Sequence, residues 1–201
     1  MLISESHQFL FFHVAKAAGT SVRSALQPYC LPVTDSRWSS FLRHFDLPKD
    51  YRRYRFLKHA SVCEAEGKLP AEMFADYRRI TFVRNPWDRL VSQYVYRFRK
   101  RKKIEFSDYV DLCLKQGNLS QHDFLADKSG SIDFAFIGRF ESLSQDYQRM
   151  GRELGVALPE LPTLNASRHR TGCYQEYYSN DLRQKLQASF AADQECFDYE
   201  F

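Results

Sequence analysis

The sequence predicts an α/β fold of three layers, in which helices cover both faces of a mostly parallel central sheet. Three largely apolar, strand-like runs carry this prediction, because strands buried on both faces of a parallel sheet form nearly continuous apolar stretches. Helix-like segments separate the runs, and strands that alternate with helices are typical of this architecture. The runs are Phe9–Val14, Arg79–Arg84 and Phe134–Ile137.

Length and composition favour one soluble domain. With 201 residues, no linker and no internal repeat, we expect a single domain over residues 1–201. An apolar share of 44% and a charged share of 27% exclude a disordered or fibrous chain. No run reaches the roughly 20 apolar residues of a membrane helix, and residues 1–7 lack the basic start of a secretory signal. These observations indicate a cytoplasmic protein without a membrane span.

The elements between the first and second runs are bounded by prolines and mixed composition. Besides a helix over residues 22–26, closed by the prolines that follow it, the sequence predicts an irregular connection, a short strand and a second helix. The irregular connection is expected over residues 30–53, the short strand over residues 54–58 and the second helix over residues 70–77.

The helix after the second run has the clearest start signal. Asn85 is a residue type that caps helices, and Pro86 suits the first helical position. Apolar residues then recur at helical spacing, so one face of this helix is expected to pack on a core. They are Trp87, Leu90, Val91, Tyr94, Val95 and Phe98.

The second half of the chain predicts three more helices and one loop. The helices are marked by apolar residues at helical spacing, and the loop by its polar composition. The helices are expected around residues 106–114, 143–154 and 182–190, and the polar loop over residues 116–133.

Ligands of such sheets bind beyond the carboxyl ends of the strands. Residues 15–21 follow the first run, and they have the composition of a phosphate cradle. Small residues allow the backbone to approach an oxyanion, the following helix presents N–H groups, and Lys16 adds a positive charge. The order differs from the nucleotide-triphosphatase loop, because Lys16 precedes Gly19. A plain strand-turn-helix corner with an exposed lysine is the alternative interpretation.

A second anion site is predicted at residues 84–92, after the second run. Arg84 ends the strand and Ser92 lies two helical turns further on, so together they could hold a second anionic group. The alternative is that Asn85 and Asp88 only cap the helix, while Arg84 forms a surface ion pair.

In this order, the two segments resemble the cofactor signatures of the sulfotransferases that use 3′-phosphoadenosine 5′-phosphosulfate (PAPS). The carbohydrate branch, sulfotransferase family 2, is the most similar, with its "PK-x-G-G-T-S" loop and "RNP-x-x-R-L-V-S-x-Y" segment. The resemblance spans essentially the whole chain and implies a P-loop-NTPase-like sulfotransferase fold. Further similar segments are Lys58–Ser61, Phe136–Glu141, Leu161–Ser167 and Phe197–Glu200.

The resemblance implies a role for each matching residue. Arg84 and Ser92 would bind the 3′-phosphate, and no metal is required. Ala15 stands where the family usually has Pro, and Ala18 where it often has Gly, so cofactor affinity depends on the turn that alanine adopts at position 18. The 5′-phosphosulfate loop would consist of Lys16, Ala17, Ala18, Gly19, Thr20 and Ser21.

His59 is the candidate catalytic base. It follows the expected strand over residues 54–58, the resemblance places a catalytic histidine there, and an ordinary histidine pKa of about 6.5 suits proton abstraction near neutrality. Lys16 is suited to stabilise charge on the bridging oxygen of the leaving group. His13 lies inside the first apolar run and is expected to be a core residue or to support a residue of the site from behind, while His122 and His169 are weaker candidates.

The resemblance implies transfer of a sulfuryl group from PAPS to a hydroxyl of a carbohydrate acceptor, with adenosine 3′,5′-bisphosphate (PAP) as the product. Residues 97–103 carry six positive charges, which either attract an anionic glycan or only form a solvated helix end. No nucleic-acid-binding motif accompanies them. Two alternatives remain: a P-loop-type kinase, and a nucleotide-binding module without catalytic activity.

Overall fold

The computed structural model describes residues 1–30, 58–98, 104–117, 119–161 and 172–201. In these residues, four strands form one sheet in the order β1 (Leu2–Ser4), β2 (Phe9–Phe12), β3 (Arg78–Val83) and β4 (Phe136–Arg139). β2, β3 and β4 are parallel, whereas β1 runs antiparallel to β2. The prediction of a mostly parallel sheet is therefore confirmed.

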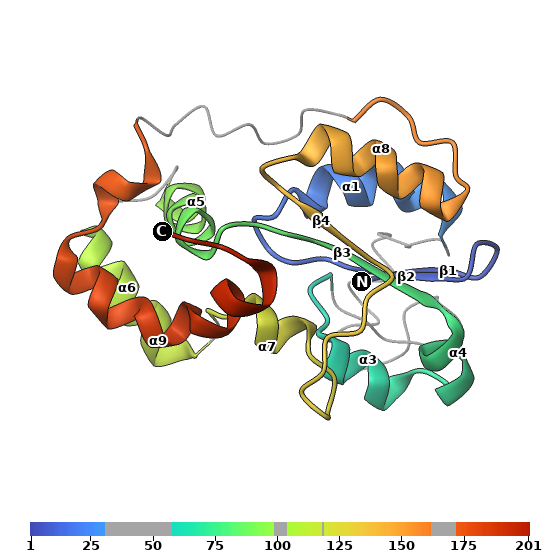
Figure 1. Cartoon of the computed structure of the whole chain (residues 1–201), viewed down its shortest axis with the longest axis horizontal. Helices are drawn as coiled ribbons and strands as arrows, with labels where there is room; N and C mark the ends of the chain where they lie inside the picture. The colour runs from blue at the N-terminus through green and yellow to red at the C-terminus, as the bar shows by residue number, and fades with distance from the viewer. Residues whose placement is uncertain (31–57, 99–103, 118, 162–171) are drawn as a thin grey trace, which may run out of the picture.

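Helices cover both faces of this sheet, as Figure 1 shows. α1 (Gly19–Leu26) and α8 (Leu143–Leu154) lie on one face. α3 (Val62–Lys68) and α4 (Ala71–Asp76) lie on the opposite face. The three-layer α/β architecture expected from the sequence is thus present.

The continuous apolar run of β2 has a direct structural reason. Successive side chains of a strand point to opposite faces. Phe9 and Phe11 belong to the core beneath α1 and α8, while Leu10 and Phe12 belong to the core on the side of α3. All four are fully buried. A strand in this position needs apolar residues at every site.

A third core lies beyond the carboxyl end of the sheet. It is formed by α5 (Pro86–Phe98), α6 (Phe106–Gln116) and α9 (Asn180–Phe197), together with the short helix η2 (Tyr174–Tyr177). Trp87 is at its centre, with its ring 4.8 Å from that of Phe190 and 5.2 Å from that of Tyr178. The apolar face predicted for α5 is the one that packs here.

The start of α5 forms as its sequence predicts. The Asn85 side-chain oxygen accepts a hydrogen bond from the backbone N–H of Trp87 at 3.0 Å, which satisfies an N–H group that the helix itself cannot pair. Pro86 occupies the first helical position. This geometry fixes where the chain turns away from β3, directly after Arg84.

The polar loop expected over residues 116–133 is wrong in its central part. That segment contains α7 (Gln121–Leu125), whose start is capped by Ser120. Gln121 and Leu125 are buried, at 1% and 0% exposure. The mainly polar composition concealed this helix, because Gln121 is buried through hydrogen bonds and not through apolar contacts.

Other differences concern short elements. The sequence did not predict β1 or α3, which have three and seven residues. The third run forms a strand two residues later than expected, because β4 begins at Phe136. Of the strand expected over residues 54–58, positions 54–57 lie outside the described residues, as does nearly all of the connection over residues 30–53. The 3₁₀-helix η1 (Gln27–Tyr29) follows α1 directly.

Across the described ranges, none of the helices has both the length and the apolar character that crossing a membrane requires.

Candidate functional site

The loop between β2 and α1 is a tight turn with two left-handed residues. Lys16 has a φ of +69° and Ala18 a φ of +58°. Ala18 is the N-cap residue of α1, and its carbonyl oxygen accepts the backbone N–H of Ser21 at 3.0 Å. Within the described residues no side chain caps α1, and its first turn carries no acidic residue. The loop therefore presents a helix N-terminus suited to an anion.

Lys16 is oriented toward α5. Its ammonium nitrogen lies 4.0 Å from the ring centroid of Tyr96, at the distance of a cation–π interaction. Ser92 is one turn before Tyr96 on the same helix, so both lie on the same side of α5. Ser92 is buried, at 3% exposure. Lys16 and Ser92, which the sequence placed at two separate motifs, thus share one region.

Arg84 connects the two motifs directly. One terminal nitrogen of its guanidinium donates to the backbone carbonyl of Lys16 at 3.1 Å. Its Nε and its other terminal nitrogen lie 2.8 and 2.6 Å from a carboxylate oxygen of Asp88. The guanidinium also stacks on the Phe140 ring at 3.8 Å. The ion pair with Asp88 is buried, not at the surface, because Arg84 is only 5% exposed.

His59 lies in a turn before α3, and its ring has a defined orientation. Its Nδ1 is 2.9 Å from the backbone carbonyl oxygen of His13. A carbonyl oxygen only accepts, so Nδ1 must carry the proton, and Nε2 is the nitrogen with a lone pair. Burial lowers the pKa of His59 below its usual value of 6.5, although the bond to His13 opposes the shift. Near pH 7 this side chain is neutral and able to accept a proton at Nε2.

His13 joins His59 to the phosphate-cradle loop. Its ring centroid is 4.6 Å from that of His59. On the other side it packs against Gly19 so closely that a Cβ at position 19 would lie 2.0 Å from its Cδ2. His13 is 2% exposed, and burial lowers its pKa to about 2, so it stays neutral. As the sequence predicts, it is a core residue.

Sequence reasoning missed two residues next to Arg84. The backbone of Arg84 is bonded to the side chain of Gln121 in α7, and Gln121 is bonded to Asp193 in α9. All three residues are buried. Nothing in the sequence near Gln121 or Asp193 indicates this arrangement, because both residue types are usually exposed.

The candidate site therefore has a positively charged loop, a buried arginine beside it and a neutral histidine joined to the loop through His13. The described part of the chain holds no group of three or more His, Cys, Asp or Glu side chains arranged for a metal ion. Such an arrangement suits an anionic ligand held by backbone N–H groups and cationic side chains.

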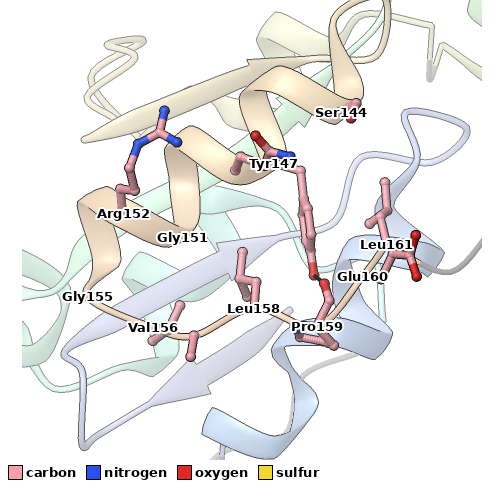
Figure 2. Close-up of a pocket in the computed structure, with 12 residues that line it drawn as sticks. Ser144, Tyr147, Gly151, Arg152, Gly155, Val156, Leu158, Pro159, Glu160 and Leu161 are labelled. Atoms are coloured by element: carbon pink, nitrogen blue, oxygen red, sulfur yellow. Dashed lines mark hydrogen bonds between the residues drawn. The ribbon is translucent and has the colours of Figure 1, made fainter.

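A surface cavity of about 820 Å³ lies elsewhere, along α8 and the segment after it (Figure 2). Tyr147 crosses it, and its hydroxyl donates to the backbone carbonyl of Pro159 at 2.8 Å. All the lining residues lie between Ser144 and Leu161. None belongs to residues 15–21, to residues 84–92 or to His59, so this cavity is separate from the candidate site.

Comparisons with known proteins identify relatives of this chain. A family model described as the sulfotransferase family matches residues 1–200. An uncharacterized protein of Archaeoglobus fulgidus is 33% identical over 99 residues, which are 47% of this chain and 79% of that protein.

Two solved structures also resemble the chain. The crystal structure of mouse sulfotransferase SULT7A1 complexed with PAP has a TM-score of 0.55 and 15% identity, over 96% of this chain and 85% of that chain. It shares the fold described above. The crystal structure of a sulfotransferase from Alicyclobacillus acidocaldarius has a TM-score of 0.41 and 16% identity, over 96% of each chain.

Proposed function

Because the chain belongs to the sulfotransferase family, we propose that it transfers a sulfuryl group from PAPS to a hydroxyl of a carbohydrate acceptor. The observation that carries this proposal is the 3.1 Å bond from the Arg84 guanidinium to the Lys16 carbonyl. It brings the two motifs that resemble the PAPS signatures to one edge of the sheet. A site for two phosphate-type groups on one nucleotide requires this proximity.

The residues present suit such a nucleotide. The uncapped start of α1 provides N–H groups for the 5′-phosphosulfate, with Thr20 and Ser21 adding hydroxyls beside Lys16. Ala17 is fully buried and packs in the core on the side of α3, which fixes the middle of the loop. Arg84 and Ser92 would hold the 3′-phosphate, because a guanidinium and a hydroxyl can both donate hydrogen bonds to phosphate oxygens.

Each proposed catalytic group acts at a stated atom. When bound, PAPS supplies the sulfuryl group, and PAP is the leaving group. Nε2 of His59 takes the proton from the acceptor hydroxyl, since Nδ1 is already committed to the His13 carbonyl. The ammonium group of Lys16 stabilises the charge that develops on the bridging oxygen. The tight turn between Lys16 and Gly19 would position the Lys16 ammonium group for this role.

A carbohydrate acceptor is supported by the similarity of the two motifs to the carbohydrate branch of the family. The positive charges of residues 97–103 would favour an anionic glycan, although residues 99–103 lie outside the described residues. The discriminating assay is sulfation of a panel of acceptors: a desulfated uronic-acid oligosaccharide, a neutral oligosaccharide and a simple phenol. Transfer to the phenol alone would contradict a carbohydrate acceptor.

The cofactor is tested by titration calorimetry with PAP, adenosine 5′-monophosphate (AMP) and magnesium-ATP. We expect PAP to bind more tightly than AMP, and Arg84→Ala to abolish this difference. Arg149→Ala is the matched control, because Arg149 is a half-exposed arginine of α8 that pairs with Asp146. Preference for magnesium-ATP would instead favour a kinase, and no binding of any nucleotide would favour a module without catalytic activity.

A further inference from the structure

The backbone of Arg84 is held by an amide side chain instead of a neighbouring strand. The N–H of Arg84 donates to Oε1 of Gln121 at 3.0 Å, and Nε2 of Gln121 donates to the carbonyl of Arg84 at 2.8 Å. The last paired residue of β3 is Val83, which lies opposite Arg139. Gln121 therefore extends the hydrogen bonding of the sheet by one residue, up to the proposed 3′-phosphate ligand.

Gln121 is itself fixed by a buried carboxylate. Nε2 of Gln121 donates to Oδ2 of Asp193 at 3.0 Å. The same carboxylate accepts the backbone N–H groups of Gln121 and His122, both at 2.7 Å, and the hydroxyl of Ser120 at 3.0 Å. Asp193 is fully buried. A buried carboxylate that accepts this many hydrogen bonds restrains the groups that donate them, which here are at the start of α7.

The carboxylate also determines which way the amide of Gln121 faces. A carboxylate only accepts hydrogen bonds, so the NH₂ group must point toward Asp193. The amide oxygen is then directed to the N–H of Arg84, and the second hydrogen of the NH₂ group to its carbonyl. A reversed amide would place its oxygen against both acceptors. The pair thus specifies one orientation of the Arg84 backbone.

The side chain of Arg84 is restrained independently, by Asp88 and by the Lys16 carbonyl. With the backbone fixed from one side and the guanidinium from the other, the position of the guanidinium depends on both sets of bonds. A buried ion pair is sensitive to small displacements, because it is strong only in good geometry.

We propose that Gln121 and Asp193 are positioning residues that fix Arg84 for the 3′-phosphate and thereby set the selectivity for nucleotides that carry one. The inference rests on the proposed role of Arg84. It deepens that role, because it names two residues, on α7 and α9, that act through the backbone of Arg84.

The test compares the dissociation constants of PAP and AMP, which differ by the 3′-phosphate alone. Gln121→Met keeps the length of the side chain but removes both bonds to Arg84. We expect the affinity for PAP to fall about tenfold and that for AMP to change less than about twofold, since about 1.4 kcal/mol corresponds to a factor of ten. Gln121→Asn, which is too short to reach both partners, is a milder second variant with the same expected direction.

Ser179→Ala is the control for lost stability. Ser179 caps α9, the helix that carries Asp193, through a bond from the N–H of Leu182, yet it has no bond to Gln121 or Arg84 among those that the structure describes. We expect it to lower the melting temperature and to leave unchanged the ratio of the dissociation constant of AMP to that of PAP. Asp193→Asn is expected to lower this ratio, as Gln121→Met does.

The outcomes separate this inference from the proposed function. An equal loss of affinity for both nucleotides in Gln121→Met and Gln121→Asn would mean a general structural role and would overturn the inference. A loss of PAP selectivity in Arg84→Ala without any loss in the Gln121 variants would also overturn it, while the proposed role of Arg84 would stand. Unchanged selectivity in Arg84→Ala would contradict the proposed role itself.

Discussion

Ala18 occupies a backbone conformation that suits glycine better. Its φ of +58° is in the left-handed region, where a Cβ crowds the following carbonyl oxygen. The signature that this loop resembles often has Gly here, so the sequence raised the question of whether alanine keeps the turn. The turn is kept, with Ala18 still accepting the N–H groups of Ser21 and Val22. The strain of about 1 to 2 kcal/mol falls on the loop proposed to bind the phosphosulfate.

We therefore expect Ala18→Gly to raise the free energy of unfolding by about 0.5 to 1 kcal/mol. Relief of the strain exceeds the greater freedom that glycine gives the unfolded chain. Thermal or urea unfolding measures the change. The matched control is Ala25→Gly, which should instead destabilise by about 1 kcal/mol or more, because Ala25 is buried inside α1. A loss of stability in both variants would mean that Ala18 is not strained.

A second prediction concerns His59, whose role as a base needs an unprotonated Nε2. We expect His59→Ala to lower the turnover number by about 10²- to 10⁴-fold while the dissociation constant of PAP stays within about twofold. His7→Ala is the control, because His7 lies in the turn between β1 and β2 and bonds only its neighbour Ser6 through its ring in the described structure. Near-normal turnover in His59→Ala would contradict the proposal that His59 is the catalytic base.

The pH dependence of turnover follows from the same residue. Burial lowers the pKa of His59, so the neutral, active form persists to lower pH than for an exposed histidine. We expect the acidic limb of the profile of turnover number against pH to have its midpoint below 6.5. A pH–rate profile whose acidic limb has its midpoint above 6.5 would contradict this.

Among the elements, α1 is placed by the contact between Gly19 and His13. A Cβ at position 19 would overlap the His13 ring, so we expect Gly19→Ala to destabilise the fold by about 1 to 3 kcal/mol. Gly67→Ala in α3 is the matched control, since the nearest atom to its new Cβ is Lys128 Nζ at 3.9 Å. It should be neutral or stabilise by up to about 1 kcal/mol.

Denaturant unfolding of both variants checks this prediction. The double variant His13→Ala/Gly19→Ala tests the cause, because removal of the ring should recover part of the loss caused by the new methyl group. Similar effects of Gly19→Ala and Gly67→Ala would show that the contact with His13 does not position α1.

The elements that could be predicted from sequence are those with a strong local pattern. The runs at β2 and β3, and the start of α5 at Asn85 and Pro86, depend on adjacent residues and were found. β1 and α7 were not, because three or five residues are too few for a periodic pattern.

The same distinction applies to the candidate site. Its loop and Arg84 were predicted from local motifs and their resemblance to a family signature, whereas the bonds from Gln121 to Arg84 and to Asp193 join residues far apart in the sequence. In a single sequence, Asp193 is indistinguishable from a surface carboxylate of α9. The orientation of the His59 ring could not be predicted from the sequence either, because it depends on a hydrogen bond to the carbonyl of His13.

At the scale of the whole molecule, α9 links two of the three cores. Leu186 and Phe190 pack in the core with α5 and α6, while Phe197 packs in the core on the side of α3. Because only two residues lie between the end of β3 and the start of α5, no linker separates the third core from the sheet. We propose that residues 1–201 form one domain that unfolds cooperatively.

Calorimetry tests this proposal, because a two-state transition has equal calorimetric and van't Hoff enthalpies. We expect one transition, and we expect Leu186→Ala to shift it as a whole, at a cost of about 2 to 5 kcal/mol. Two separate transitions, or a variant in which only part of the helical signal is lost at lower temperature, would show that the third core folds by itself.

The parallel pairing of the central strands also constrains how the chain reaches its native state. Phe9 of β2 pairs with Arg78 of β3, and Ile80 of β3 pairs with Phe136 of β4. On the ribosome, the four apolar residues of β2 emerge long before its parallel partner β3 exists. Long-range pairing of this kind is slow and leaves apolar segments exposed to aggregation. We therefore expect that shielding β2 until β3 has been synthesised raises the yield of folded chain.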